Sequence, residues 1–220
     1  TIKAFLETFK NKSTAPALIL KTQQVGTSIL DRTTILEKIN EIRKTVKGKL
    51  PNVYLVHGDL SDTQINELYN HPKVKAMVSF TKGEGFGRPL LEFSLTGKPI
   101  ISSGWSGQVD FLDRNNSILI GGNLTNVHKS AAVKDMILEQ SQWFTPDDSQ
   151  VGYAFTQLYK KYKDYVIPAK RLKNINKEKF SFEAMQKLLD RYLSQYVPEF
   201  PKQVELNLPK LNLPKLQKVE

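Results

Sequence analysis

The stretch Lys82-Gly-Glu-Gly-Phe-Gly-Arg-Pro-Leu-Leu-Glu92 is the most informative part of the sequence. Its three glycines follow the apolar run Lys75–Ser79, which predicts a buried strand, and precede Pro89–Thr96, which predicts a short helix ended by a glycine. Glycine lets a backbone approach a ligand closely, and proline suits the first position of a helix. The pattern therefore predicts a strand, loop and helix, with free amides near Phe86–Arg88 directed at an anion.

Apolar runs and helical periodicities alternate on both sides of this unit. Further buried strands are expected at 17–20, 53–56, 99–102 and 117–120, and helices at 2–9, at 33–46 with a cap at Thr33-Thr34, and at 61–69. Each strand is a continuous apolar run, which is typical of parallel strands covered on both faces. We therefore predict an α/β fold with a Rossmann-like, mostly parallel sheet and helices on both faces. Ligands of such folds bind at the carboxyl ends of the strands.

The last third of the chain differs from this pattern. Residues 151–165 and 181–197 have apolar and aromatic side chains at helical spacing, and prolines follow the second segment. A Leu-Asn-Leu-Pro-Lys repeat begins at Leu206 and cannot continue a helix. We expect an α/β domain over 1–145, a C-terminal extension of helices packing on it over 146–197, and an extended tail containing proline and lysine over 198–220.

The charge balance suggests a polyanion as a partner. The 220 residues include 32 Lys and Arg against 22 Asp and Glu, a net charge of +10. Residues 1–150 hold 18 basic and 15 acidic side chains, whereas 151–220 hold 14 and 7, so most of the excess lies in the last third. The run Tyr159-Lys-Lys-Tyr-Lys163 interleaves aromatic and basic residues, but helical spacing assigns its tyrosines to a core and its lysines to a solvated face. The case for nucleic acid is therefore not strong.

The absence of cysteine excludes disulfides and thiolate metal sites and fits a reducing compartment. No run approaches the ~18 apolar residues that span a bilayer, so no transmembrane segment is expected. We expect a cytoplasmic protein. His57, His71 and His128 lack the spacing of metal ligands, so we expect no metal site.

Three charged residues of the glycine-rich stretch are candidate ligand-binding groups. Glu84 lies in the loop, where it can accept hydrogen bonds from hydroxyls, and Arg88 adds positive charge. Glu92 lies one helical turn after Arg88 and can face the same side, where a carboxylate suits the hydroxyls of a ribose. The alternative is a tight strand-to-helix turn in which Glu92 is a solvated helix charge. Trp105, in a Gly/Ser loop, suits either stacking on a sugar or base or anchoring the loop by packing.

Glu84 and Glu92 lie in the pattern Glu-Gly-Phe-Gly-x4-Glu, which resembles the carboxyl-terminal, donor-binding half of retaining glycosyltransferases of the GT-B type, specifically family GT4, the group 1 glycosyltransferases. The resemblance spans about residues 1–195. Other segments that are similar to the family follow in the family's order: His57–Asp62, Gly97–Ile101, Trp105–Asp110, Asn115–Ile120 and the helix start at Ser181-Phe182.

The resemblance implies a hexosyltransferase whose donor substrate is a nucleotide diphosphate sugar, with no cofactor and no required metal. Glu84 would be the catalytic-site acid, holding the transferred sugar together with the loop amides, and Glu92 would bind the ribose. Retention would not proceed through a covalent intermediate on Glu84. The remaining site residues would be Gly85, Phe86, Gly87, Arg88 and Lys21 for sugar and diphosphate, and Gly58, Asp59 and Leu60 in the loop beside the base.

The family pattern also includes segments that this sequence does not contain. In the family, an opening strand, a loop with an arginine and a lysine, and an amino-terminal acceptor-binding domain precede the part that matches. We therefore expect the chain to be part of a longer polypeptide that acts on an unidentified glycan, lipid or protein acceptor. Two other interpretations are a basic nucleic-acid or polyanion-binding module and an inactive glycosyltransferase-like scaffold.

Overall fold

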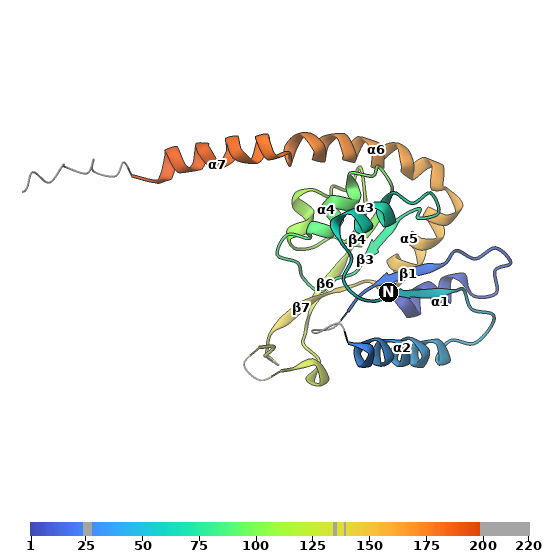
Figure 1. The fold of residues 1–220 in the computed structure, drawn as a ribbon. Helices are drawn as coiled ribbons and strands as arrows, with labels where there is room; N and C mark the ends of the chain where they lie inside the picture. Colours follow the sequence, from blue (N-terminus) through green and yellow to red (C-terminus); the bar gives the residue numbers. More distant parts are fainter. Residues whose placement is uncertain (24–27, 134–135, 139, 199–220) are drawn as a thin grey trace, which may run out of the picture. The chain divides into compact units, whose positions relative to one another are not determined.

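The computed structural model describes residues 1–23, 28–133, 136–138 and 140–198 (Figure 1). The chain divides into two compact units, Thr1–Ser181 and Phe182–Glu220. In the second unit the described residues form one helix, α7 (Phe182–Tyr196), where the sequence predicted a helix over 181–197. The predicted tail lies outside the described residues beyond Pro198. The predicted boundaries at 145/146 and 197/198 stay predictions.

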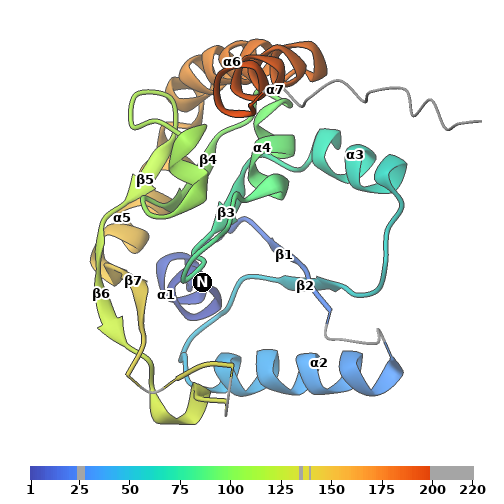
Figure 2. The same cartoon turned by 90° about the vertical axis from the view of Figure 1, so that its left-hand side faces the viewer.

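Among its described residues, the first unit has five strands in two hydrogen-bonded groups, each with parallel pairing (Figure 2). Strand β1 pairs with β2, and β3, β4 and β5 pair in that order, with Val78 opposite Ile101 and Ile101 opposite Ile118. The bounds are β1 Leu18–Lys21, β2 Val53–Val56, β3 Met77–Ser79, β4 Ile100–Ser103 and β5 Ile118–Ile120. The predicted mostly parallel sheet is confirmed, and each of the five predicted strands is present. The prediction that all five are buried is wrong for β1 and β2, in which Ile19 and Tyr54 are 43% and 54% exposed.

Helices cover both faces of the three-stranded group formed by β3, β4 and β5, as consecutive residues of β4 show. Ile101 packs with Phe5 and Phe9 of α1 (Ile2–Phe9) and with α5 (Asp148–Lys160). Ile100 points to the other face and packs with α4 (Arg88–Ser94) and with Leu172 of α6 (Tyr162–Lys179). Successive side chains of a strand point to opposite faces, so β4 is the centre of a three-layer core.

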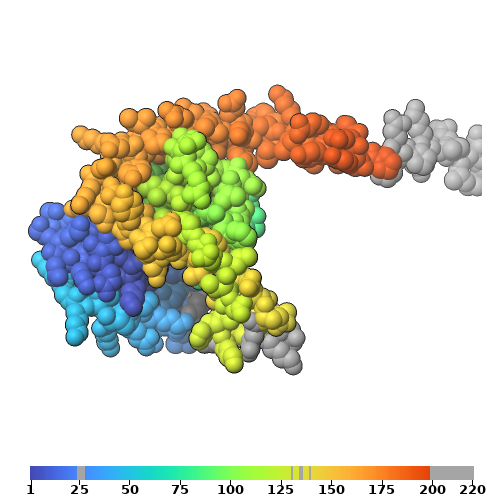
Figure 3. All heavy atoms as spheres, turned by 180° about the vertical axis from the view of Figure 1, so that it is seen from behind, coloured from blue at the N-terminus to red at the C-terminus, as the bar shows by residue number. Residues whose placement is uncertain are grey.

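The helix predicted over 2–9 is confirmed as α1, and aromatic packing fixes it against α5. The ring of Phe155 lies edge-on to Phe5 and Phe9, with centroids 5.7 and 6.0 Å away, and all three rings are buried. Figure 3 shows α1, in dark blue, directly against α5, in orange. Full burial of one such side chain contributes about 1.5–3 kcal/mol, so this cluster is a major source of stability.

Helix α2 (Ile29–Lys44) begins earlier than predicted. The Ser28 hydroxyl accepts a hydrogen bond from the Asp31 amide at 3.1 Å and caps the helix. The prediction that Thr33-Thr34 caps it is wrong, because both hydroxyls donate to carbonyl groups one turn back inside the helix. Several serines and threonines lie near the start of α2 in the sequence, and capping propensity alone does not determine which of them caps the helix. Helix α3 (Asp62–Asn70) begins as predicted, after a capping box of Ser61 and Gln64.

The helix predicted over 151–165 is in fact two helices. Helix α5 ends at Lys160 and α6 begins at Tyr162, because Lys161 between them leaves the helical region at φ −121°, ψ 36°. Helix α6 then continues to Lys179 through an internal Pro168, a continuation that the sequence analysis missed. The assignment of the tyrosines to a core is confirmed for Tyr162, which packs against the core cluster and whose hydroxyl donates to the Lys75 carbonyl at 3.1 Å. Tyr159 contacts the Phe9 ring, with centroids 5.5 Å apart, but is 40% exposed, so for this residue the prediction holds only in part.

An antiparallel hairpin, which the sequence analysis did not predict, follows β5. Its strands are β6 (Gly122–Asn126) and β7 (Gln142–Pro146). The Phe144 amide of β7 donates to the Lys82 carbonyl at 3.0 Å, so the hairpin lies against the start of the glycine-rich loop. Within the described part of the chain, no helix is long and apolar enough to cross a membrane.

Candidate functional site

The glycine-rich loop connects the carboxyl end of β3 to α4, as the sequence predicted. Gly87 precedes the helix at φ 86°, ψ 43°, in the left-handed region that favours glycine. The helix begins at Arg88, so Pro89 is its second residue rather than its first. This predicted strand, loop and helix unit is confirmed, and the loop lies at the edge of the sheet where ligands of such folds bind.

The backbone of Glu84 is held by a neighbouring loop. The Ser106 hydroxyl accepts a hydrogen bond from the Glu84 amide at 3.1 Å and donates one to the Glu84 carbonyl at 2.6 Å. The Gly107 amide donates to the same carbonyl at 3.1 Å, and a Cβ atom at Gly107 would lie 2.2 Å from the Gly85 carbonyl oxygen. The two loops therefore contact each other backbone to backbone, with no room for a side chain between them.

Arg88 and Glu92 lie on one side of α4, as their spacing predicted. Arg88 Nε lies 3.0 Å from Glu92 Oε1, and both side chains are partly exposed. Tyr69 of α3 is a neighbour of this pair. Burial, and after it the charge of Glu92, raises the pKa of the Tyr69 hydroxyl, whereas the charge of Arg88 lowers it. Its ring packs against Phe93 at 5.4 Å. Tyr69 is a neighbour of the site that the sequence analysis missed, since it is one aromatic residue on an ordinary helical face.

Phe86 anchors the loop on its other side. Its ring packs on Phe111 at 5.2 Å and on Phe180 at 5.9 Å, and 39% of the residue remains exposed. Phe180 directly follows α6, so one of the two rings that support the glycine-rich loop comes from a residue almost one hundred positions later in the chain.

A second polar group lies at the carboxyl ends of β1 and β2. Lys21 Nζ donates to Gln23 Oε1 at 3.2 Å, and Gln23 Nε2 donates to Asp59 Oδ1 at 2.8 Å. Gly58, at φ 105°, permits the turn that presents Asp59, and Leu60 follows half-buried. The structure thus brings Lys21 and the predicted base-side loop together through Gln23, which the sequence analysis missed although it lies two residues beyond the same strand end.

The hairpin lies along the start of the glycine-rich loop. Lys82 Nζ donates to Thr145 Oγ1 at 3.1 Å and lies 5.1 Å from the centre of the Trp143 ring. Trp105 stacks flat on Phe144, with centroids 5.7 Å apart and an interplanar angle of 2°. Trp105 therefore anchors the loop by packing, the second of its two predicted roles, although 42% of the residue stays exposed.

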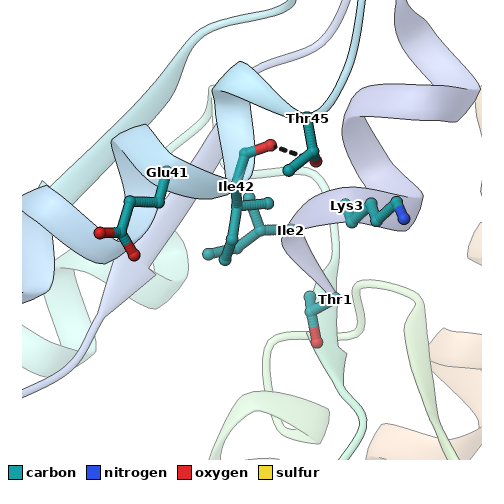
Figure 4. A pocket seen from close by; sticks show the side chains of 6 residues that line it. All are labelled: Thr1, Ile2, Lys3, Glu41, Ile42 and Thr45. Atoms are coloured by element: carbon teal, nitrogen blue, oxygen red, sulfur yellow. Dashed lines mark hydrogen bonds between the residues drawn. The ribbon is translucent and has the colours of Figure 1, made fainter.

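The site residues form two groups at the same edge of the fold, one around Glu84 and one around Lys21. Among the described residues, no hydrogen bond or ion pair links the two groups. An open hollow of about 510 Å³ lies elsewhere, between the start of α1 and the end of α2, and is lined by Ile2, Ile42 and their neighbours (Figure 4). It contains none of the predicted site residues. The described ranges contain no cluster of three or more His, Asp or Glu side chains placed to hold a metal ion.

The fold and its polar loops define a Rossmann-like α/β domain with a candidate ligand site at the carboxyl ends of its strands. No protein-family model and no curated protein matches the sequence. Among solved structures, the chain is similar to HepE of Anabaena in complex with UDP-glucose, at a TM-score of 0.61 and 16% identity. It is likewise similar to HepE with UDP and glucose, at 0.60 and 14%, and with UDP, at 0.61 and 14%. Each comparison covers 88% of this chain and 44% of HepE, so the chain spans less than half of that protein's length. At this identity the likeness shows the fold.

Proposed function

We propose that this chain is the donor-binding half of a GT4-like glycosyltransferase of the GT-B type, which transfers a sugar from a nucleotide diphosphate sugar. The observation that carries the proposal is the placement of Glu84, Arg88 and Glu92 around one turn at the carboxyl end of β3. The similar fold of HepE, which binds UDP-glucose, supports this class of ligand.

The geometry suggests a role for each side chain. The loop amides and the Glu84 carboxylate bind the hydroxyls of the transferred sugar, and Glu92 accepts hydrogen bonds from the ribose. Arg88 turns from Glu92 to the departing diphosphate. An exposed pair of this spacing contributes only about 0.3–0.5 kcal/mol, so the exchange of partners costs little. Stabilisation of the leaving group is then electrostatic, with retention of configuration and without a required metal.

The second polar group is assigned to the nucleotide end of the donor. Lys21 adds positive charge near the diphosphate, and the amide and carboxylate of Gln23 and Asp59 offer both donors and acceptors to the base. In this arrangement, the loops after β1 and β2 hold the base, and the loop after β3 with α4 holds the transferred sugar and the ribose, as expected for a ligand that lies across the carboxyl edge of a parallel sheet.

We further propose that a strand from the amino-terminal part of a longer polypeptide completes the sheet between β1 and β3. The Leu18 and Thr22 amides donate toward β2, so the amides of Ile19 and Lys21 between them point to the opposite edge. Leu18 and Val78 nevertheless pack on one core cluster, which places β1 and β3 over the same helices. The same missing part would include the domain that binds the acceptor, and the length of HepE supports it.

Calorimetric titration of the full-length protein with UDP, GDP and UDP-glucose tests this function. We expect binding of a nucleotide diphosphate, and failure to bind any of the three would refute the proposal. The polyanion-binding alternative, which the net charge of +10 favours, predicts instead a steep salt dependence of binding to DNA or RNA. An inactive scaffold would bind neither kind of ligand.

A further inference from the structure

Ser106 has a backbone conformation that is exceptional for a residue with a side chain. Its φ of 71° and ψ of −163° lie in a region that is populated almost only by glycine. Among the described residues, Asn11, at φ 60°, is the one other residue besides glycine with a positive φ. Asparagine tolerates the left-handed region, whereas serine at this combination of angles is strained. Strain of this kind persists only where the surroundings impose it.

The surroundings of Ser106 explain what imposes this conformation. Trp105, one residue earlier, is stacked flat on the buried Phe144. Gly107, one residue later, touches the carbonyl group of Gly85 so closely that no side chain fits. Between these two fixed points, the Ser106 hydroxyl makes both of its hydrogen bonds to the backbone of Glu84, at 3.1 and 2.6 Å.

A glycine at this position would adopt the same angles without strain but would have no hydroxyl. The chain therefore tolerates a strained backbone at Ser106, where the side-chain hydroxyl bonds both backbone groups of Glu84. A residue whose only role was to form the turn would gain nothing from the hydroxyl.

We propose that Ser106 is a positioning residue for the donor sugar: its hydroxyl fixes the backbone of Glu84 and so sets the direction of the Glu84 carboxylate. This inference rests on the proposed function for the identity of the ligand. It adds that recognition of the sugar, as distinct from the nucleotide, depends on Ser106. The affinity for UDP, which lacks the transferred sugar, should hardly change when the Ser106 hydroxyl is removed.

The test compares Ser106→Gly and Ser106→Ala in the full-length protein. Glycine relieves the backbone strain and alanine keeps it, so we expect the glycine variant to melt at or above the wild-type temperature and the alanine variant below it. In both variants the Glu84 amide loses its acceptor and should exchange hydrogen about tenfold faster. The affinity for UDP-glucose relative to UDP should fall about tenfold, the effect of losing one hydrogen bond of ordinary strength.

Asn11→Gly is the matched control, because it also relieves a positive φ and also removes a hydrogen bond between a side chain and the backbone, here the one that the Lys49 amide donates to Asn11 Oδ1 at 2.9 Å. Asn11 follows the end of α1, away from the glycine-rich loop, so Glu84 exchange and the affinity ratio should not change. The inference would be overturned if Asn11→Gly and Ser106→Gly changed the Glu84 exchange rate and the ratio of UDP-glucose to UDP affinity equally. It would also be overturned if Ser106→Gly kept the wild-type exchange rate and the wild-type affinity ratio. If the wild-type protein binds neither UDP nor UDP-glucose, the proposed function fails, and the Glu84 exchange rates alone then decide whether Ser106 positions the loop.

Discussion

The replacement Glu92→Ala tests the proposed ribose contact most directly. Glu92 is partly exposed and its carboxylate contacts Arg88 at one oxygen, 3.0 Å away, which leaves the other oxygen for a ligand. A hydrogen bond to a charged group contributes about 1.5–3 kcal/mol. Loss of the ribose contact should therefore raise the dissociation constant for UDP or GDP, whichever the protein binds, about 10- to 150-fold.

The same replacement should hardly change the stability of the fold. Both partners of the Arg88 pair are partly exposed, so solvent screens the interaction and its loss costs roughly 0.3–0.5 kcal/mol. For a domain of this size, that corresponds to a fall of about 1–2 °C in melting temperature. A large loss of affinity with almost no loss of stability is the expected signature of a residue that contacts the ligand.

Calorimetric titration gives the affinity, and a thermal unfolding scan gives the stability. Glu178→Ala, which removes an exposed glutamate from α6, is the control and should leave both unchanged. Wild-type nucleotide affinity in Glu92→Ala would refute the assignment of Glu92 to the ribose. Improved binding to DNA or RNA would instead favour the polyanion-binding alternative, since the replacement removes a negative charge.

Three further predictions concern the loops and the core. Gly107→Ala should abolish UDP-glucose binding in calorimetry, because its Cβ atom would lie 2.2 Å from the Gly85 carbonyl oxygen. Gly83→Ala should be tolerated, because the nearest atom to its Cβ would be 4.0 Å away. Equal losses of UDP-glucose affinity in the two variants would contradict the packing of the two loops. Phe155→Ala should destabilise the fold by about 3–5 kcal/mol in urea unfolding, because the ring fills the core between α1 and α5, and a loss below about 1 kcal/mol would contradict that packing. Hydrogen bonds from the hydroxyl and the amide of Ser149 lower the pKa of Asp147. The ionised carboxylate therefore stabilises the fold above its unfolded pKa, and this contribution is lost as the pH falls through the lower folded pKa. In an NMR pH titration, Ser149→Ala should raise the Asp147 pKa toward its ordinary value.

The sheet was predictable because its signals are local. Continuous apolar runs such as Val53–Val56 favour strands, even though this one leaves Tyr54 54% exposed, and the glycine pattern before Arg88 leaves few backbone alternatives. The start of α2 and the break at Lys161 were mispredicted because each depends on a choice among similar residues that tertiary packing makes. The hairpin strand Gly122–Asn126 is mostly exposed and polar, so it has no apolar run to reveal it.

The contact between Arg88 and Glu92 was predictable, whereas the contacts that support the loop were not, and the ligand-binding roles of the site residues stay predictions. Arg88 and Glu92 are recognisable because their spacing on one helix places them one turn apart, just after the loop that contains Glu84. Ser106 and Gln23 contact site residues from other loops, at separations of 22 and 36 positions for their partners Glu84 and Asp59. No local periodicity reports contacts of that range, so only the folded structure reveals which polar side chains hold the site in place.

The distribution of charge also favours a small ligand over a polyanion at this site. The stretch Lys82–Glu92 contains two basic and two acidic residues, although the whole chain carries a net charge of +10. A polyanion gains affinity by meeting unopposed positive charges and releasing counterions, and Glu84 and Glu92 would repel it. A nucleotide diphosphate sugar instead presents anionic phosphates beside neutral hydroxyls, which match a cation next to carboxylates. Binding at this site should therefore depend only weakly on salt, even though the excess positive charge of residues 151–220 would make any contact with nucleic acid strongly salt-dependent.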